Sequence, residues 1–282
     1  MGLHSPRSFE DDVRQSVYEY VERHGAASPA ELARSVRIED EPPQSKPARS
    51  GTDSPDVLPS RDALEAAIEG LKREGHLVET DGKLRLALEG PPIEREVDEG
   101  TVTIRPAREE DRAGLIAAMR AVGSEETYVV AEDVADHLEG EPALVRVDEE
   151  RSRVFFVAVL ERESADSERG RDEERAAVDP TATVVGWLHV DAPELPSLCH
   201  TAELTVGVVP DHRLEGIGSA LLEYGLDWAE GEYRKVYQSV PATNERAIAF
   251  LEENGWTREG ERDEHYRIDD EFVDEVQFAI WP

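Results

Sequence analysis

The sequence lacks long hydrophobic runs and has a single cysteine among its 282 residues. A membrane-spanning helix needs about 20 consecutive apolar residues, so no such span is expected. The opening residues MGLHSPRSFEDD contain no basic stretch followed by an apolar one, so no secretory leader is expected and a cytoplasmic protein is predicted. Cys199 cannot form a disulfide within the chain, and a small buried side chain is the expectation for it. Without a second thiol or a tight cluster of histidines, no metal site is predicted.

Positive charge is also scarce, and lysine most of all. Lysine occurs only at positions 46, 72, 83 and 235, and 64 acidic residues against 31 basic ones give a formal net charge of −33. Such a surface repels itself in dilute buffer, but at molar salt the screening length falls to about 3 Å. We interpret the charge as adaptation to a salt-rich cytoplasm, as in haloarchaea. An acidic surface that attracts cationic substrates is the weaker interpretation, because the same screening abolishes long-range steering.

Length and charge distribution indicate two domains. A hydrophobic content of 39% is enough to bury a sizeable core. Residues 1–90 hold 18 acidic and 12 basic side chains, whereas residues 91–282 hold 46 and 19. The residues Gly90-Pro91-Pro92 are typical of a boundary. We therefore predict one domain over 1–90 and a second over 91–282.

The first segment carries three helix signals. Apolar residues recur at helical spacing over 13–21, and this helix should end near Gly25. Ser28-Pro29 is typical of an N-cap followed by proline in the first helical position. A third helix is expected to begin at Ser60 and to stop at Gly75. Between the second and third helices, the Pro-, Ser- and charge-rich residues 39–59 predict a long flexible loop.

A hairpin signal follows the third helix. Asp81-Gly82 separates the short apolar segments HLVET and KLRLAL, which predicts a two-residue β-turn. Three helices followed by a hairpin resemble a winged helix-turn-helix domain. DNA binding stays open, because the third helix mixes both signs of charge, and a protein-interaction or homodimerisation module is an equal alternative. The charged residues concerned are Arg61, Lys72, Arg73, Glu65, Glu69 and Glu74.

The second segment alternates strand and helix patterns. Strands are predicted at 101–105, 154–160 and 183–190, and helices at 108–120 and 131–139. Residues 161–180 contain almost nothing that could be buried, so an acidic loop is expected there.

The most informative stretch is TAELTVGVVPDHRLEGIGSALLEYGLDWAE, residues 201–230. Alternation over 201–209 predicts a strand that places Glu203 on the opposite face from Leu204, and Pro210 ends it. Gly216 and Gly218 then open an apolar-periodic helix. Glycines at a strand-to-helix turn let backbone amides approach an anion, and the helix N-terminus adds partial positive charge. This predicts a pyrophosphate site.

Two other phosphate motifs fit less well. A dinucleotide fold needs a third glycine where this chain has Leu221, and a P-loop needs Gly-Lys-Ser/Thr. The segment Arg213-Leu-Glu-Gly216-Ile-Gly218 instead resembles the R/Q-x-x-G-x-G/A motif of the GNAT superfamily of N-acetyltransferases. Residues 244–256, NERAIAFLEENGW, are similar to the family's later N-x-x-A segment. The resemblance covers about 101–282 and implies an α/β fold whose mixed central sheet has two splayed parallel strands.

The resemblance also implies a site for acetyl-CoA between the strands 203–209 and 234–240. Main chain near Val208 and Val209 should hold the pantetheine, and a backbone N–H near Val209 should polarise the thioester carbonyl. Asn244 should either hydrogen-bond the cofactor or cap its helix. The pyrophosphate should meet the amides of Arg213, Leu214, Glu215, Gly216, Ile217, Gly218 and Ser219. Glu215 stands where relatives often have a basic residue, which predicts weaker affinity.

Acetyl transfer to an amine needs a base, because an unperturbed lysine-type amine with a pKa near 10.4 is mostly protonated at neutral pH. Glu203 is the candidate, and it resembles the strand glutamate of the histone acetyltransferase branch. Tyr237 and Tyr266 could protonate the leaving thiolate, or could instead pack or line the substrate site. Leu251 and Ser239 replace a tyrosine and a glutamate that N-terminal acetyltransferases of ribosomal proteins carry, so that mechanism is not carried over.

The expected function is therefore transfer of an acetyl group to a primary amine of a protein or small molecule, by direct attack in a ternary complex. The alternative is a transcriptional regulator whose degenerate GNAT domain senses acyl-CoA. Residues 125–140 and 191–200, where the acceptor should bind, carry no pattern that identifies it.

Overall fold

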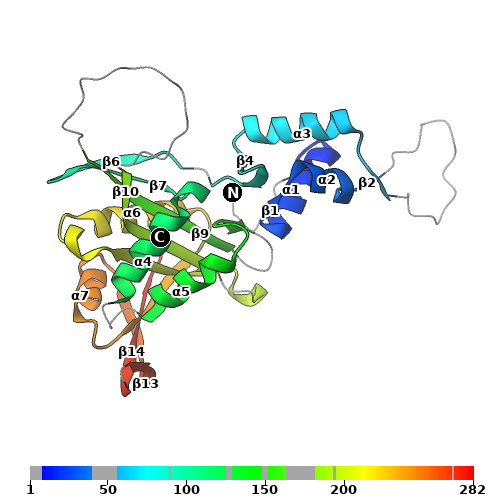
Figure 1. The fold of residues 1–282 in the computed structure, drawn as a ribbon. Helices are drawn as coiled ribbons and strands as arrows, with labels where there is room; N and C mark the ends of the chain where they lie inside the picture. The colour runs from blue at the N-terminus through cyan, green and yellow to red at the C-terminus, as the bar shows by residue number, and fades with distance from the viewer. Residues whose placement is uncertain are drawn as a thin grey trace, which may run out of the picture. The chain divides into compact units, whose positions relative to one another are not determined.

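The computed structural model describes residues 8–39, 56–88, 90–124, 129–147, 152–162, 182–192, 195–268 and 270–282. They form two compact units (Figure 1). The small unit holds the described residues from 8 to 88 together with 145–147, and the large unit holds those from 90 to 144 and from 152 to 282. Most of the two loops predicted at 39–59 and 161–180 lies outside the described residues.

The small unit contains the three predicted helices, and their start signals are confirmed. The Ser28 side chain accepts a hydrogen bond from the Glu31 amide at the start of α2, and Ser60 accepts one from Ala63 at the start of α3. Gly25 and Gly75 follow α1 and α3 with φ of 73° and 78°. The elements are α1 (Asp12–His24), β1 (Ala26–Ala27), α2 (Pro29–Ser35), β2 (Ile38–Glu39), β3 (Asp56–Val57), α3 (Arg61–Arg73), β4 (Leu77–Thr80), β5 (Lys83–Leu86) and β8 (Arg146–Val147).

The predicted hairpin is also confirmed. Asp81 and Gly82 both have positive φ, 55° and 70°, as a type I′ turn requires, and β4 pairs with β5 in antiparallel register. At the two ends of the predicted 39–59 loop, β2 and β3 form a short antiparallel strand pair in which Ile38 faces Val57. Whether this unit is a winged helix that binds DNA stays a prediction. On α3 the cation of Arg61 pairs with Glu65, and that of Lys72 with Glu69 and Glu79.

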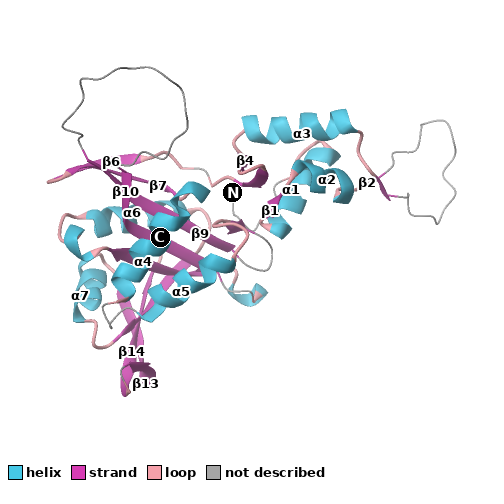
Figure 2. Ribbon diagram, in the orientation of Figure 1, coloured by secondary structure: helices cyan, strands magenta, loops and turns pink. Residues whose placement is uncertain are grey.

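The large unit is built on a mixed sheet, coloured magenta in Figure 2. Its strands follow the order β13-β14-β12-β11-β10-β9-β7-β6, and every neighbouring pair along this path is antiparallel except β11 and β12. The sequence reading missed β6, because its residues are almost all exposed and show no alternation. The strands are β6 (Ile93–Val97), β7 (Gly100–Pro106), β9 (Ser152–Arg162), β10 (Ala182–Ala192), β11 (Thr201–Val208), β12 (Lys235–Pro241), β13 (Thr257–Ile268) and β14 (Glu271–Ile280).

Helices cover both faces of this sheet. On one face α4 (Arg112–Gly123) and α5 (Val129–Gly140) bury Trp187 of β10 in a core with residues such as Leu115 and Leu138. On the other face α6 (Ile217–Glu230) packs so closely that a Cβ at Gly225 would lie 2.7 Å from Leu188 of β10. Trp187 and Leu188 point to opposite faces because successive strand residues alternate. No helix in the described ranges is both long and apolar enough to cross a membrane.

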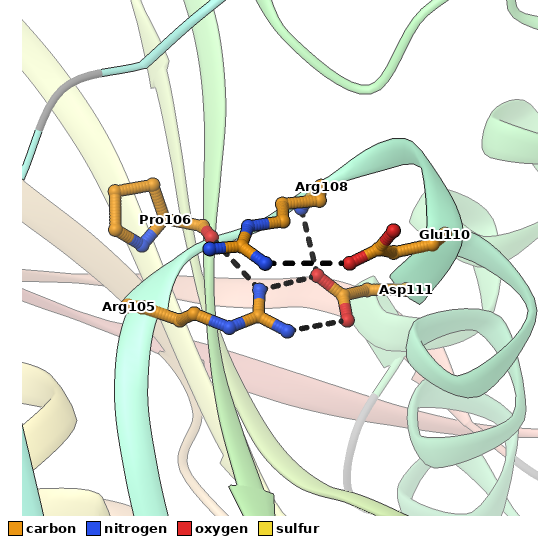
Figure 3. A network of polar contacts seen from close by, with 5 residues as sticks. All are labelled: Arg105, Pro106, Arg108, Glu110 and Asp111. Carbon is orange, nitrogen blue, oxygen red and sulfur yellow. Dashed lines mark hydrogen bonds and ion pairs between the residues drawn. The ribbon is translucent and has the colours of Figure 1, made fainter. Parts of the chain in front are cut away.

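A buried ion pair fixes the corner between β7 and α4 (Figure 3). Arg105 Nη1 and Nη2 donate to the two carboxylate oxygens of Asp111 over 2.6 and 2.9 Å, and the Arg108 amide donates to the same carboxylate over 2.7 Å. Asp111 ends the 3₁₀ turn η1 (Glu109–Asp111), so the helix predicted from 108 begins as 3₁₀ and becomes α-helical at Arg112. Charge-assisted hydrogen bonds therefore hold the corner in addition to the packing of the buried Ala107.

Cys199 is exposed, so the expectation that it is buried was wrong. It lies in the turn between η2 (Pro196–Leu198) and β11, where the chain runs over the surface before entering the sheet. The presence of one cysteine in the sequence does not determine whether its side chain is buried.

Candidate active site

The strands β11 and β12 diverge after a short parallel contact. They pair only over Thr201–Lys235, Ala202–Val236 and Glu203–Tyr237, although β11 continues to Val208 and β12 to Pro241. A pocket of about 450 Å³ lies between the diverging halves, within the range of small-molecule sites. It is lined by residues 205–208 of β11, by 238–241 of β12, by parts of the loop and helix at 212–219, and by α7 (Glu245–Glu253). The splayed parallel strands expected from the resemblance are present.

The backbone amides around Val209 face different neighbours. The Val209 N–H donates to the Val185 carbonyl over 2.9 Å, so it is engaged with β10. Because hydrogen-bonding directions alternate along an antiparallel strand, the N–H groups of Val206 and Val208 point away from β10, toward the gap. The Val208 carbonyl points the same way, since it accepts a hydrogen bond from Arg213 Nε over 2.9 Å. Val208, not Val209, therefore offers an amide to a ligand in the gap.

The loop before α6 forms the end of the pocket. Gly216 is the residue before the helix and has φ of 78°, a conformation that favours glycine. No side chain caps this helix, so the first amides of α6 are open to a ligand. Leu214 also has a positive φ, 69°, and is 96% exposed. Of the predicted cofactor residues, those lining the pocket are Val208, Arg213, Leu214, Gly216, Gly218, Ser219 and Asn244; Val209, Glu215 and Ile217 do not line it.

Glu215 and Ile217 do not line the pocket, for different reasons. Ile217 is buried beneath the helix, with 1% of its surface exposed. The Glu215 carboxylate lies 3.8 Å from Nδ1 of His212, a buried residue that itself lines the pocket. The acidic side chain is thus directed toward a histidine rather than toward the open loop.

Gln238 places a buried hydrogen-bond acceptor in the pocket wall, where an amide-bearing ligand could reach it. Its side chain lines the pocket and is 9% exposed, and its Oε1 has no hydrogen-bond partner within the described structure. A buried carbonyl oxygen left unpaired costs about 1–3 kcal/mol. The pantetheine arm of coenzyme A carries amide N–H groups that would satisfy this acceptor, so the lining suits the ligand that the resemblance implies.

Glu203 lies at the base of the gap, with charged and polar neighbours on both sides. It faces Asp191 of β10 in register, and Tyr237 of β12 on the other side. Burial raises the pKa of Glu203, and the negative charges of Asp191 and Glu275 raise it further. Burial, followed by the charges of Glu203 and Asp191, also raises the pKa of Tyr237. Such a carboxyl group holds a proton more readily than an exposed one.

Tyr266 belongs to a network on the β13–β14 hairpin. Its hydroxyl donates to Glu275 Oε1 over 3.0 Å, and Arg262 Nη1 lies 2.9 Å from Oε2 of the same buried carboxylate. Burial and Glu275 raise the pKa of Tyr266. None of Glu203, Tyr237 and Tyr266 lines the pocket itself, but Tyr237 precedes the lining residue Gln238. The described residues contain no group of three His, Cys, Asp or Glu side chains that could hold a metal ion.

Asn244 caps α7, which is one of the two roles expected of it. Its Oδ1 accepts a hydrogen bond from the Ala247 amide over 3.1 Å, and the side chain also lines the pocket. Sequence reasoning missed Arg246 and Phe250, which line the pocket from the same helix. Their spacing of four residues, which places them on one helix face, was the signal that could have found them.

Comparison with known proteins gives a family match for part of the chain. Residues 144–256 match the family model described as Acetyltransferase (GNAT) family, and this range contains every residue that lines the pocket. The match identifies a GNAT acetyltransferase domain in this chain. No curated protein matches the chain.

The solved structures that this chain resembles are distant. The acetyltransferase of GNAT family from Streptococcus pneumoniae is 18% identical, with a TM-score of 0.46 over 64% of this chain and 99% of that one. Ribosomal-protein-alanine N-acetyltransferase from Brucella melitensis is 22% identical, with a TM-score of 0.43 over 64% and 99%. Spermidine N-acetyltransferase from Vibrio cholerae, in complex with CoA and spermine, is 17% identical, with a TM-score of 0.42 over 64% and 95%. At these scores the likenesses carry no information on activity.

Proposed function

We propose that this chain is an acetyl-CoA-dependent N-acetyltransferase that acts on a primary amine of a protein or small molecule. The observation that supports this most directly is the pocket between β11 and β12, which opens beyond the Glu203–Tyr237 pair and ends at the uncapped start of α6. An elongated ligand with an anionic end and amide groups along its length suits both ends of that pocket.

Three parts of the chain would hold the ligand. The amides at the start of α6, next to Gly216, would bind the pyrophosphate. The unpaired Gln238 Oε1 would accept an N–H from the pantetheine arm. The Val208 amide would bind a carbonyl group of that arm from the opposite wall, and the thioester at the end of the arm supplies the acetyl group.

Catalysis would then depend on groups at the base of the gap. The Val206 N–H, which faces the gap nearer to Glu203 than Val208 does, would stabilise negative charge on the acetyl oxygen as the amine nitrogen bonds to the acetyl carbon and the carbon–sulfur bond breaks. Glu203 would take the proton from the amine, since its raised pKa brings it closer to the working pH. Tyr237, kept protonated by burial, would donate a proton to the leaving sulfur. Tyr266 is the second candidate donor, although its hydroxyl already bonds Glu275.

The remaining features refine this proposal. The small unit would direct the enzyme to a protein or DNA partner or form a homodimer, and the net charge of −33 favours a cytoplasm rich in salt.

The test measures thiol release from acetyl-CoA with a panel of amines and peptides in molar KCl. Wild type should release CoA with at least one acceptor, and Gly216→Glu should lower kcat/KM by roughly tenfold or more, because it adds strain and negative charge where phosphate binds. Gly231→Glu is the matched control, since nothing lies within 4 Å of a Cβ there. Folded protein that shows no binding of acetyl-CoA in calorimetry would refute the proposal. Binding of acetyl-CoA without any turnover would favour the alternative, a transcriptional regulator that senses acyl-CoA.

A further inference from the structure

Arg95 projects from β6, a strand that the sequence reading missed and that lies outside the residues matched by the family model. The strand forms the edge of the sheet, and Arg95 faces Val102 of β7 in register. The residue is exposed. Which groups its guanidinium can bind therefore depends on the residues around it.

The guanidinium of Arg95 lies against the backbone of Gly216. A Cβ at Gly216 would be 2.6 Å from Arg95 Nη2, 3.1 Å from Cζ and 3.3 Å from Nε. Glycine at this position thus serves both the positive φ and the approach of an arginine from a distant strand. No carboxylate within the described ranges forms an ion pair with Arg95, so none of those residues neutralises its charge beside the loop.

The two opposite charges of the loop itself offset each other. Glu215 is acidic and Arg213 is basic, and Arg213, which lines the pocket, donates through Nε to the Val208 carbonyl. Arg246 contributes a second guanidinium from the α7 wall of the pocket. Arg95 is the cation in contact with the glycine that begins the anion site. In a chain with a net charge of −33, a positive group at that point offsets the general repulsion of a polyanionic ligand.

We propose that Arg95 binds the pyrophosphate of the acyl-CoA that occupies the pocket, and so adds positive charge beside a loop in which Arg213 and Glu215 offset each other. This inference rests on the proposed function. A guanidinium donates two parallel hydrogen bonds to a phosphate, whereas backbone amides at a helix start donate single ones. The β6–β7 hairpin thereby becomes part of the cofactor site.

Calorimetry with three ligands tests the inference: acetyl-CoA, acetyl-dephospho-CoA and S-acetylpantetheine, which lacks the pyrophosphate. Arg95→Ala should raise the Kd for the first two ligands by roughly 10- to 100-fold, because charge-assisted hydrogen bonds are lost. The Kd for S-acetylpantetheine should not change. Arg95→Lys should restore part of the affinity. Arg267→Ala, which removes an exposed arginine paired with Asp270 on the β13–β14 hairpin, is the matched control and should bind like wild type.

The outcomes separate the two proposals. Wild-type protein that binds none of the ligands would refute the proposed function and this inference together. Normal affinity of Arg95→Ala for acetyl-CoA, in a wild type that binds it, would refute only the role of Arg95. A loss of affinity that extends to S-acetylpantetheine would show a structural defect in Arg95→Ala. A loss of affinity confined to acetyl-CoA would mean that Arg95 contacts the 3′-phosphate, which acetyl-dephospho-CoA lacks. Either result would overturn the pyrophosphate assignment.

Discussion

Glu203 and Tyr237 face each other across β11 and β12 at the last position where the two strands remain in register. Beyond this pair the strands separate and the pocket begins. The candidate base and the candidate acid therefore come from opposite walls at the narrow end of the gap. A substrate held at this end of the gap would have the candidate base on one strand beside it and the candidate acid on the other.

Replacing Glu203 with glutamine should remove the base. The raised pKa of Glu203 means that its active, ionised form is lost as the pH falls through that raised value, so wild-type kcat should decline on the acidic side. Glu203→Gln should lower kcat by about 10²- to 10⁴-fold and remove that acidic limb, leaving only the dependence set by the amine itself. The measurement is kcat against pH by thiol release. The exposed Glu271→Gln is the control; a variant that keeps the wild-type profile would exclude Glu203 as the base.

The same substitution should affect stability in the opposite sense. Folding disfavours the charged form of Glu203, so this residue destabilises the protein increasingly as the pH rises from the ordinary glutamate value, about 4.3, through the raised pKa in the folded state. Glu203→Gln should therefore melt at a higher temperature than wild type near neutral pH and at the same temperature below about pH 4. A variant less stable than wild type at neutral pH would contradict the assigned burial cost.

Gln238→Leu should separate binding from folding. The change removes a buried oxygen that has no partner in the described structure, so the ligand-free protein should keep its stability or gain about 1 kcal/mol in the free energy of unfolding. Affinity for S-acetylpantetheine should fall by roughly fivefold to tenfold, because one hydrogen bond is lost. Denaturant unfolding and calorimetry measure the two effects. Gln277→Leu on β14, outside the pocket lining, should leave affinity unchanged.

The two expected roles of Asn244 can be told apart with two variants. Asn244→Ala removes the cap on the Ala247 amide and should cost about 0.5–2 kcal/mol in the free energy of unfolding. Asn244→Asp keeps the capping oxygen and should fold like wild type, but it loses the amide donor. Reduced affinity of Asn244→Asp for acetyl-CoA, measured by calorimetry, would show that the side chain also binds the ligand. Unchanged affinity would leave the cap as its role.

Breaking the Arg105–Asp111 pair should be costly. Asp111→Ala leaves a mostly buried guanidinium without its bidentate partner, and we expect a loss of about 3–5 kcal/mol in the free energy of unfolding. The exposed pair of Arg267 and Asp270 offers the comparison: Asp270→Ala should cost less than about 1 kcal/mol. Denaturant unfolding measures both. Equal, small losses would mean that the corner is held by packing instead.

The features that sequence predicted correctly are those that depend on local physics. Ser28 and Ser60 satisfy helix amides within three residues of themselves, and Asp81-Gly82 adopts a turn that few other dipeptides tolerate. Gly216 before α6 was recognised for the same reason, because a left-handed residue at a strand-to-helix turn is a local requirement.

What sequence could not supply depends on contacts between distant segments. The edge strand β6 has an exposed, charged pattern, and only its pairing with β7 makes it a strand. The placement of Arg95 beside Gly216 joins residues more than a hundred positions apart. The direction of the Val209 amide follows from the register of β10 and β11, which alternation within one strand does not determine.

The short contact between β11 and β12 divides the sheet into two arrays that few residue pairs connect. The strands from β6 to β11 form one continuous antiparallel array, and β12 to β14 form another, with three residue pairs joining them. Amides of the smaller array should therefore exchange with solvent through partial opening at that junction rather than through global unfolding. A ligand that bridges both walls would slow this exchange on the two sides together, so the coenzyme would act as a structural brace as well as a reactant.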